Sequence, residues 1–179
     1  MWNLVTLDGF FEGGAPWDLD FHRTVFDSDL ERFSIDQLQT ADLLLFGRVT
    51  YEGMAAHWKQ AKGEVADFMN RLPKAVVSTT LAHADWDNTE VISADVPARI
   101  RELKATGKRN MYVFGSATLS ATLIHEGLFD EYRLAIVPVV LGEGKPLFPM
   151  GAQPTQMTLI ESRTLASGCV ILCYQPQRS

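Results

Sequence analysis

Three features are scarce or missing in this sequence: cysteine, runs of basic residues and long apolar stretches. The 16 Lys and Arg residues are scattered among 22 Asp and Glu residues, giving a net charge of −6, so the phosphate-tracking surface of a nucleic-acid-binding protein is not expected. No apolar run reaches the roughly 18 to 20 residues of a membrane span, and the first residues lack the cationic start of a signal peptide. These absences predict a cytoplasmic protein without nucleic-acid or membrane partners.

The two cysteines, Cys169 and Cys173, lie in an alternating apolar stretch that is typical of a strand. At about 3.3 Å per residue their Cα atoms would be about 13 Å apart, which is too far for a disulfide. The four histidines are scattered, and no second Cys or His pair occurs at ligand spacing, so no metal site is expected. We therefore expect two buried thiols.

Strand and helix signals alternate along the 179 residues, whose length and 46% hydrophobic content are typical of one globular domain over residues 1–179. Strands are expected at 4–7, 42–46, 74–78, 90–93, 111–114, 132–140, 157–165 and 169–174. Helices are expected at 30–40, 48–58, 64–71, 97–105 and 117–125. Residues 10–26 mix Gly, Pro, Trp and Phe without a period and predict a long loop that forms a lid or pocket wall.

This order of elements predicts an α/β fold with a mostly parallel mixed sheet flanked by helices and an antiparallel C-terminal hairpin. The continuous apolar stretch 42–46 is of the kind buried on both faces of a parallel sheet. The alternating apolar residues of the C-terminal hairpin have two interpretations: part of a homodimer interface, or the core face of one sheet.

A strand meets a helix through a glycine at two places, Gly47 and Gly115. In an open α/β sheet such turns lie at the carboxyl ends of the strands, where helix N-termini attract anions. Further donors nearby are the hydroxyl groups of Thr50, Ser116 and Thr118 and the guanidinium of Arg48. Either turn alone is better explained as a tight turn with a cap. Two of them, one with an arginine, favour a dinucleotide site.

Five segments, taken in order, resemble the dihydrofolate reductase-like superfamily, and more closely the reductase domain of the bifunctional riboflavin-biosynthesis deaminase/reductase. The segments are 6–9, 44–52, 73–78, 113–119 and 130–148. The deaminase half is absent, because no H-x-E with P-C-x-x-C zinc signature occurs. The first strand is expected to be short for this fold.

The resemblance implies NADPH bound along the carboxyl edge of the sheet. Carried over by position, the residues that would contact the phosphates are Gly47, Arg48 and Thr50, with Arg48 a candidate for the 2′-phosphate. Those near the adenosine ribose would be Ser78 and Thr79. The pyrophosphate would be held by Gly115, Ser116, Ala117, Thr118 and Leu119. Arg48 beside Ser78 and Thr79 predicts a preference for NADPH over NADH.

Two carboxylates are the candidate catalytic residues. The resemblance places Asp8, at the end of the first strand, near the nicotinamide, although Asp8-Gly9 also fits a plain turn. Asp29-Leu-x-x-Phe33 resembles the helix that carries the substrate-binding acid of true dihydrofolate reductases, although a helix N-cap is the simpler explanation of an Asp there.

The resemblance thus implies an NADPH-dependent reductase of a small nitrogen heterocycle. The substrate would be a pyrimidine resembling 5-amino-6-(5-phosphoribosylamino)uracil of riboflavin biosynthesis, or a pterin or dihydrofolate. The alternative is a non-catalytic NADPH-binding sensor or interaction module on the same fold. The two hypotheses differ in whether Asp8 and Asp29 affect NADPH oxidation.

Overall fold

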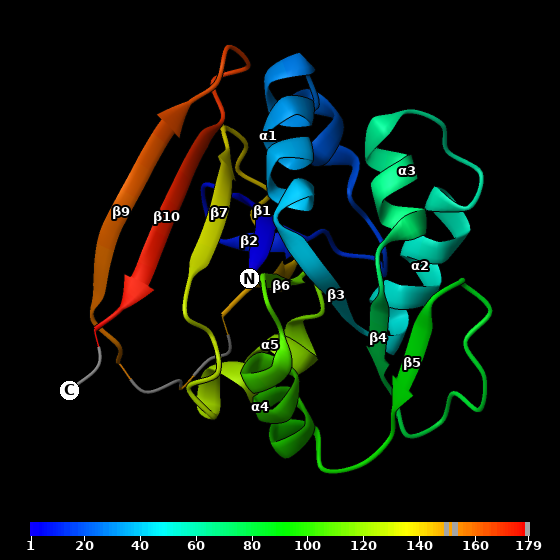
Figure 1. The fold of residues 1–179 in the computed structure, drawn as a ribbon. Coiled ribbons are helices and arrows are strands. Elements are labelled where there is room, and N and C mark those ends of the chain that lie inside the picture. The colour runs from blue at the N-terminus through cyan, green and yellow to red at the C-terminus, as the bar shows by residue number, and fades with distance from the viewer. Residues whose placement is uncertain (149–150, 152–153, 178–179) are drawn as a thin grey trace. The chain divides into compact units, whose positions relative to one another are not determined.

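The computed structural model describes residues 1–148, 151 and 154–177, and its strands and helices alternate along the chain (Figure 1). The strands are β1 (Trp2–Thr6), β2 (Phe10–Glu12), β3 (Ala41–Gly47), β4 (Lys74–Val77), β5 (Thr89–Ile92), β6 (Asn110–Val113), β7 (Tyr132–Val137), β8 (Lys145–Pro146), β9 (Met157–Thr164) and β10 (Val170–Pro176). The helices are the 3-10 helix η1 (Asp20–Thr24) and the α-helices α1 (Ser28–Gln39), α2 (Arg48–Trp58), α3 (Glu64–Arg71), α4 (Val96–Thr106) and α5 (Ala117–His125). Helices α3 and α5 have the bounds expected from the sequence.

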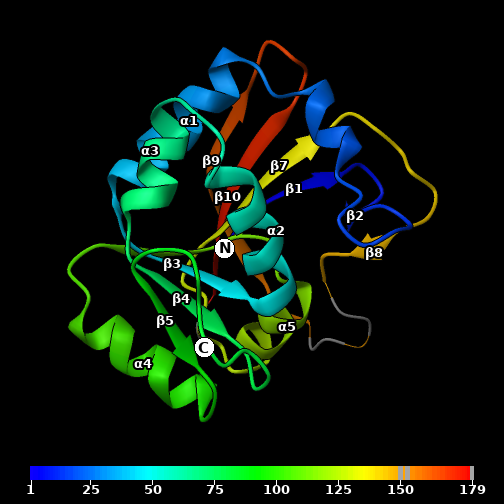
Figure 2. The same cartoon turned by 90° about the vertical axis from the view of Figure 1, so that its right-hand side faces the viewer.

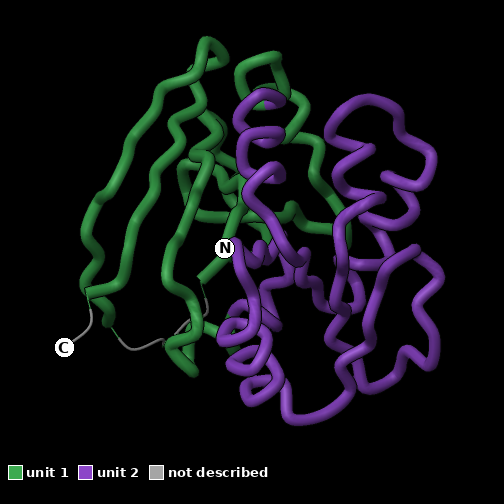
Figure 3. The backbone as a smooth tube through the Cα atoms, viewed as in Figure 1, with its two compact units in different colours: residues 1–30, 121–179 green, residues 31–120 purple. Residues whose placement is uncertain are grey.

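The chain divides into two compact units, which Figure 3 colours separately. Unit 1 comprises residues 1–30 and 121–179, and unit 2 comprises residues 31–120, so unit 2 is an insertion within the sequence of unit 1. Each point of insertion falls inside a helix, because the bounds of α1 and α5 include residues of both units. The expectation of one domain over residues 1–179 stays a prediction.

Unit 2 is built on an all-parallel sheet with the strand order β5-β4-β3-β6. Figure 2 shows the arrows of β3, β4 and β5 running the same way. Leu44, Leu45 and Phe46 in β3 are fully buried, as expected of a strand that is covered on both faces. Helix α2 packs on β3 and β4. The predicted buried parallel strand is therefore confirmed.

Unit 1 is built on a mixed sheet with the order β1-β7-β10-β9. Strands β1 and β7 are parallel, and β10 is antiparallel to both β7 and β9. The turn of the β9-β10 hairpin is closed by a 2.8 Å hydrogen bond from the Leu165 N–H to the Cys169 carbonyl. The predicted α/β class and C-terminal hairpin are confirmed, with the main strands divided between two four-stranded sheets.

The buried thiols expected from the sequence are also present in unit 1. Cys169 and Cys173 are free and buried, and burial raises the pKa of the Cys169 thiol to about 11. Both are therefore protonated, apolar packing groups at neutral pH.

The expectation of a continuous loop over residues 10–26 is wrong. Strand β2 begins at Phe10 and pairs antiparallel with β8, and η1 begins at Asp20. The local sequence does not predict β2, because its partner strand β8 lies more than a hundred residues further along the chain. The strand expected at 132–140 ends at Val137, where Pro138 lacks the N–H needed to continue the ladder.

None of the helices within the described residues is both long and apolar enough to cross a membrane. Over the same ranges, no group of three or more His, Cys, Asp or Glu side chains lies together as a candidate metal site.

Candidate functional site

Three strand ends at one edge of the unit 2 sheet bring most of the predicted cofactor residues together. Strand β3 lies between β4 and β6 and runs parallel to both, so the segments that follow these three strands meet at their common carboxyl edge. Gly47 ends β3, Ser78 follows β4, and Gly115 comes shortly after β6. The sequence predicted this arrangement from the two glycine turns.

The two glycine turns are joined by reciprocal hydrogen bonds. The backbone N–H of Gly47 donates to Ser116 Oγ at 2.9 Å, and the backbone N–H of Ser116 donates to Thr50 Oγ1 at 3.1 Å. The Ser116 hydroxyl is also 3.0 Å from the carbonyl oxygen of Phe114, to which it donates. These hydroxyl groups therefore hold the two turns against each other, a role that the sequence did not predict.

The backbone of the second turn is strained. Gly115 has φ +56, a conformation that favours glycine, and a Cβ there would lie 3.3 Å from the Thr50 side chain, so a larger residue would be strained where the two turns approach each other. Ser116 also has a positive φ of 61, which is uncommon for a residue with a side chain. Strain of this kind persists where surrounding contacts fix the backbone, and it is concentrated at ligand sites.

Helices α2 and α5 begin directly after these turns. The first backbone N–H groups of each helix lack an intrahelical acceptor and carry a partial positive charge, so they suit an anion. Ala117, Thr118 and Leu119 form the first turn of α5. Leu119 is buried, whereas Thr118 is exposed.

Arg48 opens α2, and its guanidinium is engaged on the protein surface. Its Nη1 lies 3.0 Å from both carboxylate oxygens of Glu52, one helical turn further along. Both side chains are close to half exposed, so this ion pair is weak and can be exchanged for a ligand phosphate.

Ser78 and Thr79 differ in what their side chains can do. Ser78 is buried, and its Oγ accepts the backbone N–H groups of Thr80 at 3.2 Å and Leu81 at 2.9 Å. Ser78 thereby shapes the turn after β4. Thr79 is exposed.

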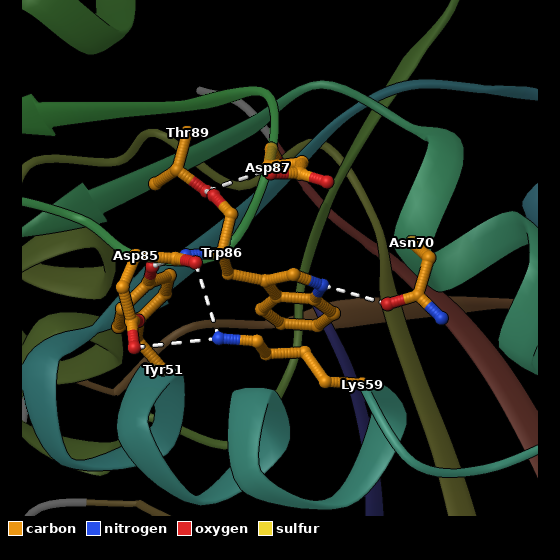
Figure 4. A network of polar contacts seen from close by, with 7 residues as sticks. All are labelled: Tyr51, Lys59, Asn70, Asp85, Trp86, Asp87 and Thr89. Carbon is orange, nitrogen blue, oxygen red and sulfur yellow. Dashed lines mark hydrogen bonds and ion pairs between the residues drawn. The ribbon is translucent and has the colours of Figure 1, made fainter.

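The segment between β4 and β5 is anchored by a buried tryptophan that sequence reasoning missed (Figure 4). The backbone N–H of Trp86 donates to the Tyr51 hydroxyl at 2.8 Å, and its indole Nε1 donates to Asn70 Oδ1 at 2.8 Å. Beside this buried pair, Lys59 forms an exposed ion pair with Asp85 at 3.3 Å. Tyr51 belongs to the same segment as Gly47 and Thr50, so α2 links the first glycine turn to the loop that carries Thr79.

Lys74 lies beneath the Trp86 ring and closes the end of α3. Its Nζ is 4.6 Å from the ring centroid and donates to the carbonyl oxygens of Met69, Asn70 and Leu72 at 2.9, 3.1 and 2.7 Å. Burial lowers the pKa of Lys74 to about 8. All these partners belong to the chain itself, so Lys74 supports the fold around Trp86.

Asp8 lies in unit 1 and holds a loop in place. Its carboxylate accepts the Thr6 hydroxyl at 2.6 Å and the backbone N–H groups of Leu141 at 3.1 Å and Gly142 at 2.8 Å. The Thr6 hydroxyl and then the Gly142 N–H hold the pKa of Asp8 below its ordinary value. A carboxylate of this kind is anionic at neutral pH and is a poor proton donor. The predicted catalytic role of Asp8 stays a prediction.

Asp29 is also in unit 1, and it is not the cap of α1. Asp27 Oδ1 accepts the backbone N–H groups of Asp29 and Leu30, both at 3.0 Å, so the capping residue is Asp27. Asp29 Oδ2 makes a long hydrogen bond of 3.5 Å with the Ala166 N–H in the β9-β10 turn. Asp8 and Asp29 therefore contact different loops.

Comparison with known proteins assigns this sequence to a family. The sequence matches the RibD C-terminal domain family over residues 2–171. It is 34% identical to the uncharacterized protein YyaP of Bacillus subtilis over 178 residues, which cover 95% of this chain and 90% of YyaP.

Two solved structures share the fold at lower sequence identity. A candidate riboflavin biosynthesis protein from Shewanella sp. PV-4 has a TM-score of 0.81 at 20% identity, covering 99% of this chain and 97% of that one. A pyrimidine reductase-like protein from Corynebacterium diphtheriae has a TM-score of 0.69 at 13% identity, covering 99% of this chain and 91% of that one. The chain belongs to the RibD C-terminal domain family, and its fold is dihydrofolate reductase-like.

Proposed function

We propose that this protein is an NADPH-dependent reductase of a small nitrogen heterocycle, with the nucleotide bound at the carboxyl edge of the unit 2 sheet. The observation that carries the proposal is the reciprocal pairing of the turns at Gly47 and Ser116. This pairing sets the N-termini of α2 and α5 side by side at adjacent strands, which is the arrangement that binds the phosphates of a dinucleotide.

The residues at this edge fit a nucleotide with a pyrophosphate and a further phosphate. Gly115 lets the backbone approach the pyrophosphate, and the α5 residues Ala117, Thr118 and Leu119 supply backbone donors. Arg48 and Thr79 are exposed at the neighbouring strand ends, where they would bind the 2′-phosphate that distinguishes NADPH from NADH.

Bound NADPH would supply the hydride, and the chain would orient the reactants and handle the proton. In unit 1, Asp8 is the proposed carboxylate on the substrate side. Because Asp8 holds Leu141 and Gly142, its first effect is to fix the loop that follows β7. As an anion, Asp8 would orient a cationic or N–H-bearing ring, while the transferred proton comes from solvent.

The family points to the class of substrate. The Corynebacterium diphtheriae relative is named as pyrimidine reductase-like, and the Shewanella relative is named for riboflavin biosynthesis. We therefore propose a phosphorylated aminopyrimidine such as 5-amino-6-(5-phosphoribosylamino)uracil as the first substrate to test, and a pterin or dihydrofolate as the second.

Calorimetric titration of the purified protein with NADPH and NADH tests the nucleotide site. We expect NADPH to bind at least about tenfold more tightly, since a 2′-phosphate gains charge-assisted hydrogen bonds. NADPH oxidation is then followed with each heterocycle in turn. A protein that binds neither nucleotide at millimolar concentration would refute the proposal.

The second candidate function is a non-catalytic NADPH-binding module. It is favoured by one observation: the carboxylates of Asp8 and Asp29 are both hydrogen-bonded by groups of the chain itself. The two functions are distinguished by one result, because a sensor binds NADPH yet oxidises it with none of the heterocycles.

A further inference from the structure

The loop between β2 and η1 displays a tryptophan on the surface of unit 1. The loop is closed on itself, because the Gly13 N–H donates to the Asp18 carbonyl at 2.8 Å and the Asp18 N–H donates to the Ala15 carbonyl at 3.1 Å. Trp17, within this loop, is 37% exposed. Among the described residues, neither another aromatic ring nor a cation lies against its indole. The indole is therefore accessible to a planar ligand.

The backbone of Trp17 is strained and is held by a buried carboxylate. Its φ of 67 lies in the left-handed region, which is exceptional for a bulky residue. The Trp17 N–H donates to Oε1 of Glu12 at 2.6 Å, and Glu12 is only 8% exposed. Backbone strain persists where neighbouring contacts over-determine it, and such positions cluster at ligand sites. Glu12 thus fixes the backbone from which the indole projects.

Glu12 is itself anchored to the segment 141–145, which follows β7. Strand β2 pairs with β8 so that Glu12 lies opposite Lys145, and Lys145 Nζ is 3.8 Å from Glu12 Oε2. Gly144, with φ +154, lies so close to the backbone of Glu12 that a Cβ there would collide with the Glu12 carbonyl oxygen. The loop that carries Trp17 is therefore built against this segment.

Asp8 holds the same segment from its other contacts. Its carboxylate accepts the backbone N–H groups of Leu141 and Gly142. The Cα atoms of Gly142 and Gly144 are two residues apart and so are at most about 7 Å from each other. The proposed carboxylate on the substrate side and the tryptophan loop thus share one short support within unit 1.

Two exposed aliphatic side chains lie beside Asp8. Leu7, which precedes it, is 62% exposed, and Val140, which precedes Leu141, is 69% exposed. The Leu7 N–H donates to the Val139 carbonyl at 2.9 Å, so the two segments are in contact. Apolar and aromatic side chains around a few polar groups are typical of a small-molecule site. Unit 1 therefore exposes an indole and two aliphatic side chains on the segments around one carboxylate.

We propose that the indole of Trp17 is the surface on which the planar ring of the substrate stacks, and that Glu12 is the residue that positions this indole. The proposal rests on the proposed function as a reductase of a nitrogen heterocycle. Aromatic pairs stack in offset geometry, and the electron-rich face of an indole favours an electron-poor ring. Stacking holds the substrate by its face, which leaves its N–H edge for Asp8 to orient.

Two-dimensional NMR of the indole Nε1–H groups tests the stacking directly. The chain has four tryptophans, and the Trp17 signal is the one that Trp17→Phe removes. Lumazine, a planar pteridine, is titrated to about 1 mM into the free protein and into protein with NADP⁺. We expect the Trp17 signal to shift with lumazine while the signal of buried Trp86 in unit 2 stays in place. Ribose 5-phosphate, which has no aromatic ring, should leave the Trp17 signal unmoved.

Equilibrium dialysis measures the affinity for lumazine in variants of the two residues. Trp17→Leu keeps an apolar side chain without an aromatic face and is expected to weaken binding about tenfold, whereas Trp17→Phe should weaken it less than about threefold. Glu12→Ala keeps the indole but removes the acceptor of the Trp17 N–H, and we expect the same loss as in Trp17→Leu. Glu12→Gln keeps an oxygen acceptor and should restore binding to within about threefold of wild type. Thermal unfolding establishes that each variant is folded.

Three outcomes would overturn the proposal: a Trp17 signal that lumazine leaves in place, equal lumazine affinity in Trp17→Leu and wild type, or a shift with NADP⁺ alone as large as that with lumazine. In the last case the stacked ring would be the nicotinamide. Failure of the proposed function is a separate result, because it is measured as the absence of NADPH binding. NADPH binding with an unmoved Trp17 signal would refute only the role of Trp17.

Discussion

Arg48 meets Glu52 in an exposed ion pair at the start of α2, and this pair gives a direct test of the nucleotide site. Arg48→Ala is expected to weaken NADPH binding about tenfold while leaving NADH binding unchanged, because only NADPH offers a 2′-phosphate. Calorimetric titration with both nucleotides measures the two affinities.

Glu52→Gln is the matched control for Arg48. It removes the competing carboxylate and keeps the guanidinium, so NADPH affinity should stay equal or rise by a few-fold at most. Equal losses for NADPH and NADH in Arg48→Ala would remove Arg48 from recognition of the 2′-phosphate.

Asp8 gives a second prediction at the scale of single residues. Asp8→Asn is expected to speed amide exchange at Leu141 and Gly142 roughly tenfold, because a neutral amide oxygen accepts more weakly than a carboxylate. Hydrogen exchange followed by NMR measures it. Unchanged exchange at both amides would contradict the role of Asp8 in holding this loop.

The pH dependence of this interaction follows from the depressed pKa of Asp8. The folded-state pKa lies below the model-peptide value of 3.8, so the stability that Asp8 contributes is present above pH 3.8 and is lost as the pH falls through the lower folded value. The difference in Tm between wild type and Asp8→Asn should therefore be constant near neutral pH and should shrink in acid.

At the scale of elements, the loop between β4 and β5 is tied to α2, and to Lys59 directly after it, by one buried and one exposed contact (Figure 4). Tyr51→Phe leaves the buried N–H of Trp86 without its acceptor and is expected to cost about 1–3 kcal/mol. Lys59→Met removes only the exposed ion pair with Asp85 and should cost less than about 1 kcal/mol. Urea unfolding compares the two, and equal costs would contradict the anchoring role of Tyr51.

Most elements were predictable from sequence because their signals are local. Helix α3 is stopped by Leu72-Pro73, and the buried strand before Gly47 is a continuous apolar run. Strand β2 was missed because it is three residues long and depends on β8, which is far away in the chain. Elements that need a distant partner leave no periodic pattern.

In the candidate site, too, features with a local sequence signal were predictable, and a contact between distant residues was not. The meeting of the turns at Gly47 and Gly115 was predictable from two strand-glycine-helix junctions in one parallel sheet. The pairing of Arg48 with Glu52 could have been read from their four-residue spacing on a helix. The contact of Tyr51 with Trp86 could not, because it joins residues 35 positions apart through a backbone N–H in an irregular loop.

At the scale of the whole molecule, the two units are expected to unfold together. Helices α1 and α5 each contain residues of both units, so opening either unit frays a helix of the other. Both cysteines lie in unit 1, where burial and the raised pKa of Cys169 protect them from alkylation until the unit opens. The urea midpoint for thiol labelling should therefore equal the midpoint for the opening of unit 2.

Mass spectrometry of alkylated protein and hydrogen exchange of the unit 2 amides measure these two midpoints. Amides of the β3 strand report the opening of unit 2 without interference from tryptophans in unit 1. Two separated midpoints would show that unit 1 and unit 2 are independent folding units, and they would contradict the expectation of one domain over residues 1–179.

Because unit 2 is inserted within the sequence of unit 1, it also determines when the strands of unit 1 can pair during translation. Strand β1 is translated first, but its parallel partner β7 follows only after all of unit 2. At translation speeds of about 5–20 residues per second, this interval is on the order of 10 s. Unit 2 can complete its sheet on the nascent chain during that time. Trp2 and Val5, which end up buried, meanwhile lack their partner strand, so β1 is the segment that a nascent-chain chaperone would be needed to shield.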